Sequence, residues 1–311
     1  MSPDAPAHAT RVPGDGVDRL SALLERFRVR AHLFHAGPLC GVTHFAAQPG
    51  RAFLHVLRRG DMWVTHKPKS GALRKLRLTE PTLLFYPRPL DHDFHNAPVD
   101  GSDFVCATLD FDGGVRHPLV QALPSVLALP VERVQGIGQT LELLFEETER
   151  VRCGQRLLAD RLFEVLLLQM LRWLLDHPAE GGVQAGVLAG LAHPKLARAL
   201  TALHEQPGVA WSLDTLARAA GMSRSAFAAE FKAAVGTPPG DYLLRWRVSI
   251  AQSQLRGGAS VKAVSDALGY ASPAAFSRAF TQVVGVSPRG WLKAESDGRP
   301  EDERADAVDD L

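Results

Sequence analysis

Two copies of one pattern follow each other near the end of this 311-residue chain. The first runs from Ser212 to Phe231 and the second from Ser260 to Phe280, at an offset of 48 to 49 residues. In each copy a serine precedes an apolar stretch of helical spacing, a glycine ends that stretch, and two phenylalanines follow at a spacing of four residues. This repeat restricts the fold strongly, because both copies must form the same supersecondary unit.

Each copy contains the parts of a helix-turn-helix. Ser212 and Ser260 can accept a hydrogen bond from an unpaired amide in the first turn of a helix. Gly221 and Gly269 can adopt the left-handed conformation at which a helix stops. A single pattern of this kind is more often an ordinary αα-hairpin. Its duplication within a basic segment favours a pair of DNA-binding units, in which the second helix enters the major groove.

The charge distribution supports a polyanionic partner. Residues 194–293 contain 12 Lys and Arg against 5 Asp and Glu, or +7, whereas residues 294–311 contain 2 against 8, or −6. The net charge of +1 therefore leaves residues 1–193 neutral. A basic domain of this kind favours nucleic acid, although a ribosomal or membrane-surface contact would have the same electrostatic basis.

A longer motif in the second copy resembles a family signature. Its residues are Gly269-Tyr270-Ala271-Ser272, Phe276-Ser277-Arg278-Ala279-Phe280, Gly285 and Ser287-Pro288. They are similar to the signature of the AraC/XylS family of bacterial transcription regulators, and the resemblance covers residues 194–293. It implies two helix-turn-helix units joined by a long helix at 240–256. It also implies recognition helices at 223–234 and 272–283, which would enter successive major grooves.

The resemblance further implies which side chains face the bases. By position, the base-facing residues are Ser225, Ala228 and Ala229 in the first helix, and Pro273, Ala274, Ala275, Ser277 and Arg278 in the second. Arg224 of the first helix is also expected to bind DNA. Most of these side chains are short and offer few hydrogen bonds to base edges. Base readout is therefore expected to depend on contacts with thymine methyl groups and on the two arginines. The implied partners are double-stranded DNA and RNA polymerase.

The front half has the texture of a small β domain. Short runs of β-branched, aromatic and leucine residues alternate with turn residues, which predicts a sandwich or barrel. The predicted strand runs are 53–57, 62–66, 73–78, 82–86 and 104–111. A short amphipathic helix is expected at 18–28. Residues 1–16 lack any periodicity and are expected to be disordered.

One segment of this half resembles a cupin motif. The run from Pro87 to Asn96 places His92 and Asn96 at the cupin spacing, with Pro89 in place of a glycine. The other cupin motif needs two histidines and a glutamate, and the corresponding run contains His55 alone. The region therefore resembles the cupin-type sensor domains that precede the helical domain in many AraC-type regulators. A cupin metalloenzyme, such as a dioxygenase, carrying a regulatory tail is the rival interpretation.

Histidines and cysteines are abundant in the β region, and two kinds of sensor chemistry follow from them. The candidate ligands for zinc or another transition metal are His35, Cys40, His44 and His92, because imidazole and thiolate suit such ions. Alternatively, Cys40 and Cys106 would respond to oxidants if neighbouring histidines lowered a thiol pKa. Scattered histidines also fit surface or hydrogen-bonded core positions, in which case the signal would be a small organic ligand.

The periodicity becomes helical after Pro130. Residues 136–152 and 155–176 place apolar residues at three- and four-residue spacing, and the second stretch is apolar around much of its circumference. Such a helix needs cover on more than one side, either from the strand domain or from a second copy of the chain. We therefore expect a helical dimerisation segment at 131–177, followed by a glycine-containing linker at 178–187.

The sequence as a whole predicts an α+β protein. Its expected parts are a cupin-like β-barrel sensor domain at 17–130, the dimerisation segment, the linker, an AraC-type DNA-binding domain with two helix-turn-helix units at 188–293 and an acidic disordered tail at 294–311. Neither a signal peptide nor a membrane-spanning stretch is evident, and three cysteines are too few for a disulfide framework, so a cytoplasmic location is expected. The expected function is transcription regulation by a homodimer without enzymatic activity.

Overall fold

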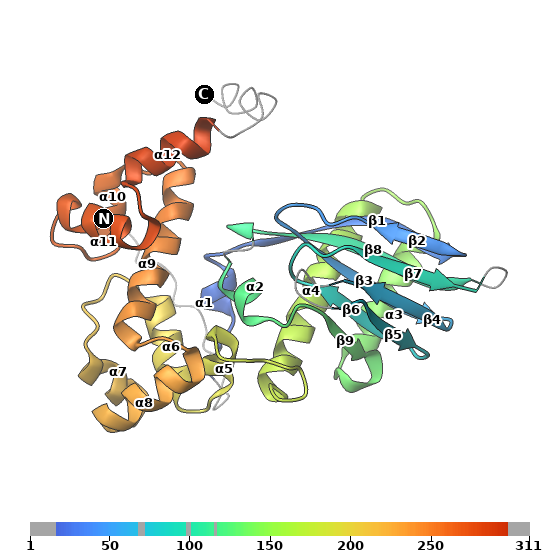
Figure 1. The fold of residues 1–311 in the computed structure, drawn as a ribbon, viewed down its shortest axis with the longest axis horizontal. Coiled ribbons are helices and arrows are strands. Elements are labelled where there is room, and N and C mark those ends of the chain that lie inside the picture. Colours follow the sequence, from blue (N-terminus) through green and yellow to red (C-terminus); the bar gives the residue numbers. More distant parts are fainter. Residues whose placement is uncertain (1–16, 68–71, 98–100, 115–116, 298–311) are drawn as a thin grey trace, which may run out of the picture.

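The N-terminal half is built from two antiparallel sheets that face each other (Figure 1). The computed structural model describes residues 17–67, 72–97, 101–114 and 117–297. The first sheet has the spatial order β1 (Val29–Leu39), β8 (Ser102–Phe111), β3 (Arg51–Arg59), β6 (Thr82–Tyr86) and β9 (Leu127–Pro130). The second has the order β2 (Val42–Phe45), β7 (His92–Asn96), β4 (Met62–His66) and β5 (Arg74–Leu78). The expected β domain is therefore present, and the expectation for residues 1–16 lies outside the described residues.

Each of the five predicted strand runs corresponds to a strand of the structure. The predicted runs 62–66 and 82–86 coincide with β4 and β6. The strand β1 was not among the predicted runs, because it lies at the edge of the first sheet and pairs only with β8. Only Ala31 of this strand is buried, so its sequence can carry polar residues such as His32.

Aromatic side chains fill the space between the two sheets. Phe53, Tyr86, Phe94 and Phe104 are almost completely buried there. Burial of one such side chain stabilises a fold by roughly 1.5–3 kcal/mol. The other face of the first sheet contributes Leu54 and other apolar residues to a second core, which continues into the helices.

Two long helices, α3 (Ile137–Glu149) and α4 (Gln155–Asp176), follow the sheets, as predicted. The amide of Leu33 in β1 donates a hydrogen bond to the Asp160 carboxylate of α4 over 2.7 Å. Much of α4 is buried against the β domain, but Leu157, Leu158 and Val165 are 71%, 41% and 39% exposed. Burial by the strand domain thus accounts for one side of the helix and leaves an apolar stripe on the other.

The helix predicted at 18–28 is only one turn long, α1 (Ser21–Leu24). Asp18 starts this turn, since its Oδ1 accepts hydrogen bonds from the amides of Leu20 and Ser21 over 3.2 and 3.1 Å. The helix cannot continue to residue 28, because the chain becomes extended at Val29 to pair with β8. The prediction was therefore too long.

The C-terminal half is entirely helical over its described residues (Figure 1). The N-terminal half also contains a short helix, α2 (Pro118–Ala122), between β8 and β9. The later helices are α5 (Val187–Ala192), α6 (Leu196–Glu205), α7 (Leu213–Ala219), α8 (Arg224–Val235), α9 (Pro239–Arg256), α10 (Val261–Ala267), α11 (Pro273–Val284) and α12 (Pro288–Asp297). Residues 294–297 of the expected disordered tail belong to α12, whereas residues 298–311 lie outside the described part.

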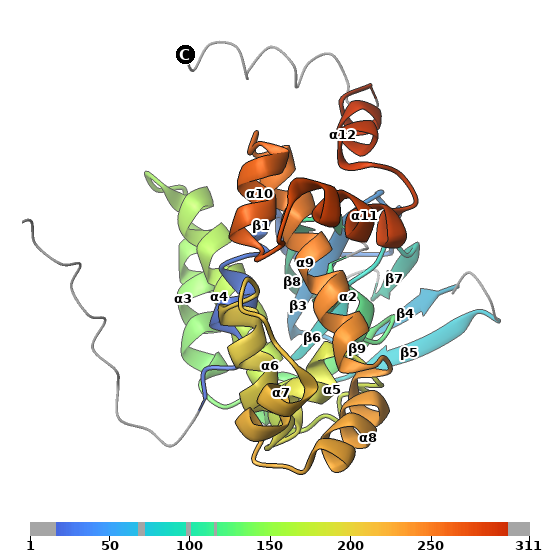
Figure 2. The same ribbon diagram turned by 90° about the vertical axis from the view of Figure 1, so that its left-hand side faces the viewer.

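The two repeat copies form matching helix-turn-helix units, α7–α8 and α10–α11, joined by α9. Ser212 accepts a hydrogen bond from the Thr215 amide, and Ser260 accepts one from the Ala263 amide, each over 3.1 Å. Both serines therefore cap the first helix of their unit, as predicted. Figure 2 shows α8 and α11 on the side of the molecule that faces away from the sheets, with α9 between them.

The glycines that end α7 and α10 have different surroundings. Gly221 and Gly269 both have a positive φ, +64° and +72°. A Cβ at Gly221 would meet nothing within 4 Å, whereas a Cβ at Gly269 would overlap the carbonyl oxygen of Gly208. Gly221 therefore meets a conformational requirement only, while Gly269 also allows two backbone segments to approach closely.

We expect alanine substitutions to separate these two requirements. Gly221→Ala should destabilise the protein by about 1–2 kcal/mol, the cost of a left-handed L-residue. Gly269→Ala should cost about 1–3 kcal/mol more, because the backbone at Gly208 must move. Scanning calorimetry of both variants measures the difference. Equal losses would contradict the close approach of Gly208 and Gly269.

Candidate functional site

The predicted base-facing residues lie on the outer faces of α8 and α11. Arg224, Ser225, Ala229, Ala274 and Arg278 are exposed. The remaining three are half-buried: Ala228, Ala275 and Ser277. The structure therefore brings all of these residues, together with the exposed Pro273, to the two helices that share one side of the molecule (Figure 2).

The inward faces of the same helices are held by phenylalanine pairs. The ring centroids of Phe227 and Phe231 are 5.5 Å apart, and those of Phe276 and Phe280 are 5.8 Å apart. All four side chains are at most 1% exposed. This burial fixes the rotation of each helix about its axis, so its short and polar side chains must face solvent.

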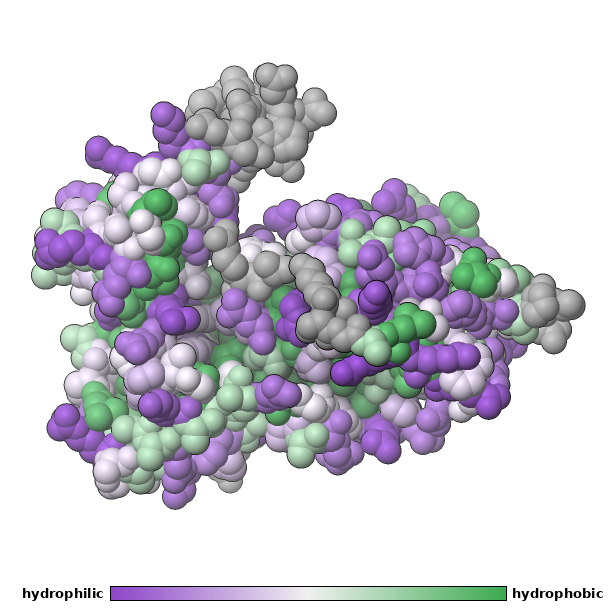
Figure 3. All heavy atoms as spheres, viewed as in Figure 1, coloured by the Kyte–Doolittle hydropathy of each residue, from purple (hydrophilic) through white to green (hydrophobic). Residues whose placement is uncertain are grey.

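Positive charge is available beside both outer faces. Arg224 is 67% exposed, and its guanidinium lies 3.7 Å from the carboxylate of Asp214, a distance at which an exposed pair contributes little energy. Arg278 has no ion pair within the described residues. The rim of the helical domain, at the left of Figure 3, carries several strongly hydrophilic residues. An anionic partner could therefore contact Arg278 directly and would compete with Asp214 for Arg224.

A pair of buried histidines lies between the two sheets. The Nε2 atoms of His55 and His92 are 2.9 Å apart, and both residues are at most 1% exposed. Nδ1 of His92 lies 2.9 Å from the carbonyl oxygen of Leu90, so it carries the proton that it donates there. Nε2 of neutral His92 is then an acceptor, and Nε2–H of His55 donates to it.

Burial keeps this histidine pair uncharged. It lowers the pKa of His92 to about 4 and the pKa of His55 well below its usual value. The His92 ring is stacked between Tyr86 and Phe45, at centroid distances of 4.0 and 5.1 Å. Sequence reasoning missed this pair, although both histidines had been noticed as remnants of the cupin motifs.

The four candidate metal ligands do not come together. Nε2 of His35 lies 3.2 Å from the carbonyl oxygen of Gly37, and Nδ1 of exposed His44 lies 2.6 Å from the carboxylate of Asp93. Cys40 is exposed beyond the end of β1, and His92 lies in the buried pair. Within the described ranges, no three His, Cys, Asp or Glu residues form a group that could hold a metal ion.

The two candidate redox cysteines have different environments. Cys40 is exposed, whereas Cys106 is buried between the sheets, opposite His35 and His55 in the strand ladders. Burial raises the pKa of the Cys106 thiol strongly. Histidine neighbours do not offset this effect, because His55 is itself uncharged. Cys106 therefore lacks the exposure and ionisation that the redox hypothesis requires.

A short N-terminal segment connects the two domains. Arg26 donates to the carbonyls of His204 and Glu205 over 3.0 and 2.8 Å, and Arg19 donates to that of Leu191 over 3.3 Å. These carbonyls lie at the ends of α6 and α5, where the helix dipole places partial negative charge. Two arginines from the β-domain side thus cap two helices of the helical domain.

An aromatic contact lies beside these arginines. The Phe27 ring packs edge-on against His117, at 5.6 Å, and against Trp246 of α9, at 5.0 Å. The ring centroid of His204 lies 4.2 Å from that of Trp246, and Nε2 of His204 shares a 2.6 Å hydrogen bond with the Tyr242 hydroxyl. Phe27 therefore links the β domain to the helix that joins both helix-turn-helix units. No sequence motif had marked it.

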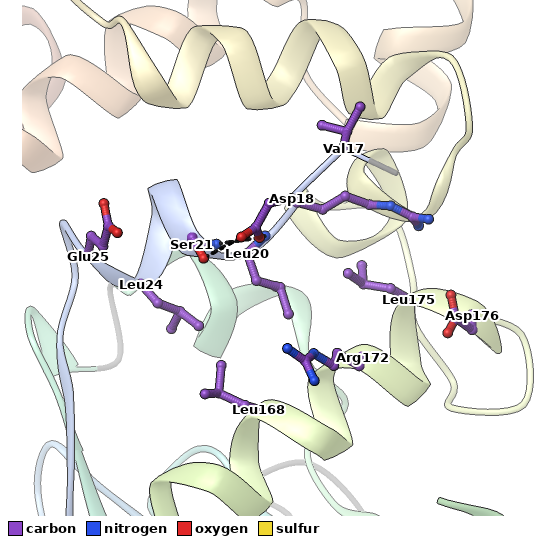
Figure 4. A pocket seen from close by; sticks show the side chains of 11 residues that line it. Val17, Asp18, Leu20, Ser21, Leu24, Glu25, Leu168, Arg172, Leu175 and Asp176 are labelled. Atoms are coloured by element: carbon purple, nitrogen blue, oxygen red, sulfur yellow. Dashed lines mark hydrogen bonds between the residues drawn. The ribbon is translucent and has the colours of Figure 1, made fainter. Parts of the chain in front are cut away.

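A cavity of about 550 Å³ opens between α1 and α4 (Figure 4). Leu24, Leu168 and Leu175 provide its apolar lining, and Arg172 extends into it beside Asp18. The Ser21 hydroxyl, which donates to Asp18, is the main cause of a lowered pKa of that carboxyl group. This cavity adjoins the segment that contacts the helical domain.

Comparison with known proteins agrees with this two-domain arrangement. A cupin family profile matches residues 18–176, and a helix-turn-helix domain profile matches residues 216–294. The protein is thus a DNA-binding transcription regulator with an N-terminal regulatory domain. It belongs to the family of AraC-like transcription regulators. None of its described helices combines the length and apolarity needed to cross a bilayer.

Two relatives from Streptomyces support the assignment. The chain is 32% identical over 242 residues to a putative AraC-like transcription regulator of Streptomyces lividans, and 38% identical over 242 residues to one of Streptomyces antibioticus. Each alignment covers 76% of this chain and 79% of the relative.

Among solved structures, the AdpA DNA-binding domain in complex with a target DNA is 31% identical to this chain. The match covers 35% of this chain and 97% of that one, with a TM-score of 0.33. ToxT of Vibrio cholerae is 10% identical, covering 86% and 97%, with a TM-score of 0.35.

The burial of Cys106 can be tested by alkylation. Iodoacetamide should add to Cys40 and Cys153, which are exposed, and leave Cys106 unmodified in the folded protein, because the thiolate that reacts is suppressed there. Intact-mass spectrometry should show two adducts under native conditions and three in urea. As a control, Cys106→Ser should give two adducts under both conditions. Three adducts at comparable rates in the native protein would contradict the buried position.

The contact of Phe27 with Trp246 should couple the unfolding of the two domains. Phe27→Ala should cost about 3–5 kcal/mol, the usual loss for a buried phenylalanine. It should also split the calorimetric transition into separate β-domain and helical-domain steps. Phe34→Ala is a matched control, since Phe34 is 46% exposed, and it should cause no splitting. A single transition in the Phe27 variant would show that other contacts suffice.

Proposed function

We propose that the protein regulates transcription as a homodimer that reads a specific DNA sequence and contacts RNA polymerase. The observation that carries this proposal is the pair of capped helix-turn-helix units, whose second helices lie on one side of α9 and turn short, polar side chains outward. Such a pair would enter successive major grooves on one face of the duplex. The regulator names of the relatives support a role without catalysis, and a cytoplasmic location follows from it.

The eight outward residues have distinct proposed roles. Arg224 and Arg278 would donate hydrogen bonds to guanine or phosphate, and Ser225 and Ser277 would bond to base edges. The four alanines, Ala228, Ala229, Ala274 and Ala275, would contact thymine methyl groups and allow close approach of the helices. Sequence preference would therefore depend on a few polar contacts.

The apolar stripe on α4 supports the proposed homodimer. Leu157, Leu158 and Val165 are exposed within a helix that is otherwise buried. Leu158 and Val165 are seven residues apart, about two turns of the helix, so they lie on one side of it, and Leu157 lies next to Leu158 along the chain. A second copy of the same helix would cover this stripe, while the strand domain covers the other side of α4.

For the sensed signal, we favour a small organic ligand over oxidants or metal ions. The buried Cys106 thiol and the separation of the four candidate metal ligands weaken the other two hypotheses. The signal would reach DNA through the contacts of Arg26 and Phe27 with the helical domain.

The base-reading role of Arg278 can be measured directly. Arg278→Ala should weaken binding to a site selected from random DNA by about 1–3 kcal/mol, because a bidentate contact to guanine is lost. Binding to non-specific DNA should change little at matched salt. Arg289→Ala, an exposed arginine of α12 outside the recognition helices, serves as the control. Equal losses on both DNAs would assign Arg278 to phosphate instead.

A further inference from the structure

A groove of about 340 Å³ lies between α3 and the end of β3, away from the DNA-binding face and outside the barrel interior. Its floor is apolar and consists of Leu57, Val131, Leu141 and Phe145. Of these, Leu57, Leu141 and Phe145 are at most 7% exposed, so they form a fixed surface. The volume is within the range of small-molecule sites, which is about 300–1,000 Å³.

The rim of this groove is acidic. Glu142, Glu146 and Glu149 project from one side of α3 and are all exposed. Glu149 lies 3.4 Å from Arg58, but no ion pair of Glu142 or Glu146 occurs within the described ranges. The C-terminal end of α3 at Glu149 adds the partial negative charge of the helix dipole. The groove therefore has a negative potential above an apolar floor.

Among the described residues that line the groove, Arg58 is the one cation, and its charge is already neutralised. Nε of Arg58 donates to the Asp103 carboxylate over 2.6 Å. Its guanidinium carbon lies 4.4 Å from the ring centroid of Phe145, a cation–π contact. The Phe145 ring and the carboxylates thus hold the Arg58 charge in place, so the charge left uncompensated at the groove is that of Glu142 and Glu146.

We propose that this α3 groove binds an amphipathic organic cation. The apolar body of the ligand lies on Leu57, Leu141 and Phe145, and its charged nitrogen lies near Glu142 and Glu146. The inference deepens the ligand-sensing role proposed above by naming a site and a ligand class. Its test uses binding alone, so a failure there leaves DNA recognition by α8 and α11 untouched.

Gly138 offers a way to fill the groove. It lies in the first turn of α3 and lines the groove, and a Cβ added there meets nothing within 4 Å. Its φ is not positive, so a larger side chain causes no backbone strain. Gly138→Leu should occupy the space that the ligand body needs.

The test is isothermal titration calorimetry of the full-length protein with decyltrimethylammonium, kept below its micelle concentration. The same-chain anion decanoate is the comparison ligand. The cation should bind at least tenfold more tightly than decanoate, and the preference should weaken at high salt. Equal binding of both ligands would overturn the proposal, because the acidic rim would then have no role.

Two variants locate the binding. Gly138→Leu should abolish binding of the cation, and the double variant Glu142→Gln/Glu146→Gln should weaken it at least tenfold without disturbing the buried floor. The control Glu205→Gln/Glu230→Gln removes two exposed carboxylates of the helical domain and should leave the affinity within twofold. Unchanged binding in the double variant, or an equal loss in the control, would overturn the assignment to this groove. Thermal unfolding of each variant shows that it is folded.

Discussion

Trp246 lies where the two domains and both helix-turn-helix units meet. Only 2% of its surface is exposed, and both Phe27 and His204 pack against its ring. The helix that carries it, α9, joins the two units, so the packing of this side chain sets the direction of α9 relative to the sheets. The common outward side of α8 and α11 depends on that direction (Figure 2).

Electrostatics reinforces the same junction. Arg19 and Arg26 cap the carbonyl ends of α5 and α6, and neither arginine comes from the helical domain itself. Because α1 also lines the cavity against α4, a movement of this one short segment would act on both domains at once. This geometry gives the regulatory domain a direct route to α9 through few contacts.

The interior of the β domain differs from that of an open ligand-binding barrel. His92 is stacked between Tyr86 and Phe45 and hydrogen-bonded to His55, so the remnants of the cupin motif contribute to packing. Neutral histidines tolerate this burial because one nitrogen of His92 donates and the other accepts. The groove beside α3 lies outside this packed interior, and its acidic rim and apolar floor are the basis of the ligand site proposed above.

Local sequence was sufficient for the helical domain and for much of its DNA-binding face. Serine caps, glycine stops and paired phenylalanines act within a few residues of one another, so the bounds predicted for the recognition helices agree with α8 and α11 to within one residue. The partners of His55, Cys106 and Phe27 could not be predicted in this way. The residues that define their environment lie far away along the chain, 37 residues in the case of His55 and His92, and only the pairing of strands and the docking of domains brings such residues together. Burial, which decides the charge of a histidine or the reactivity of a thiol, is a property of that packing.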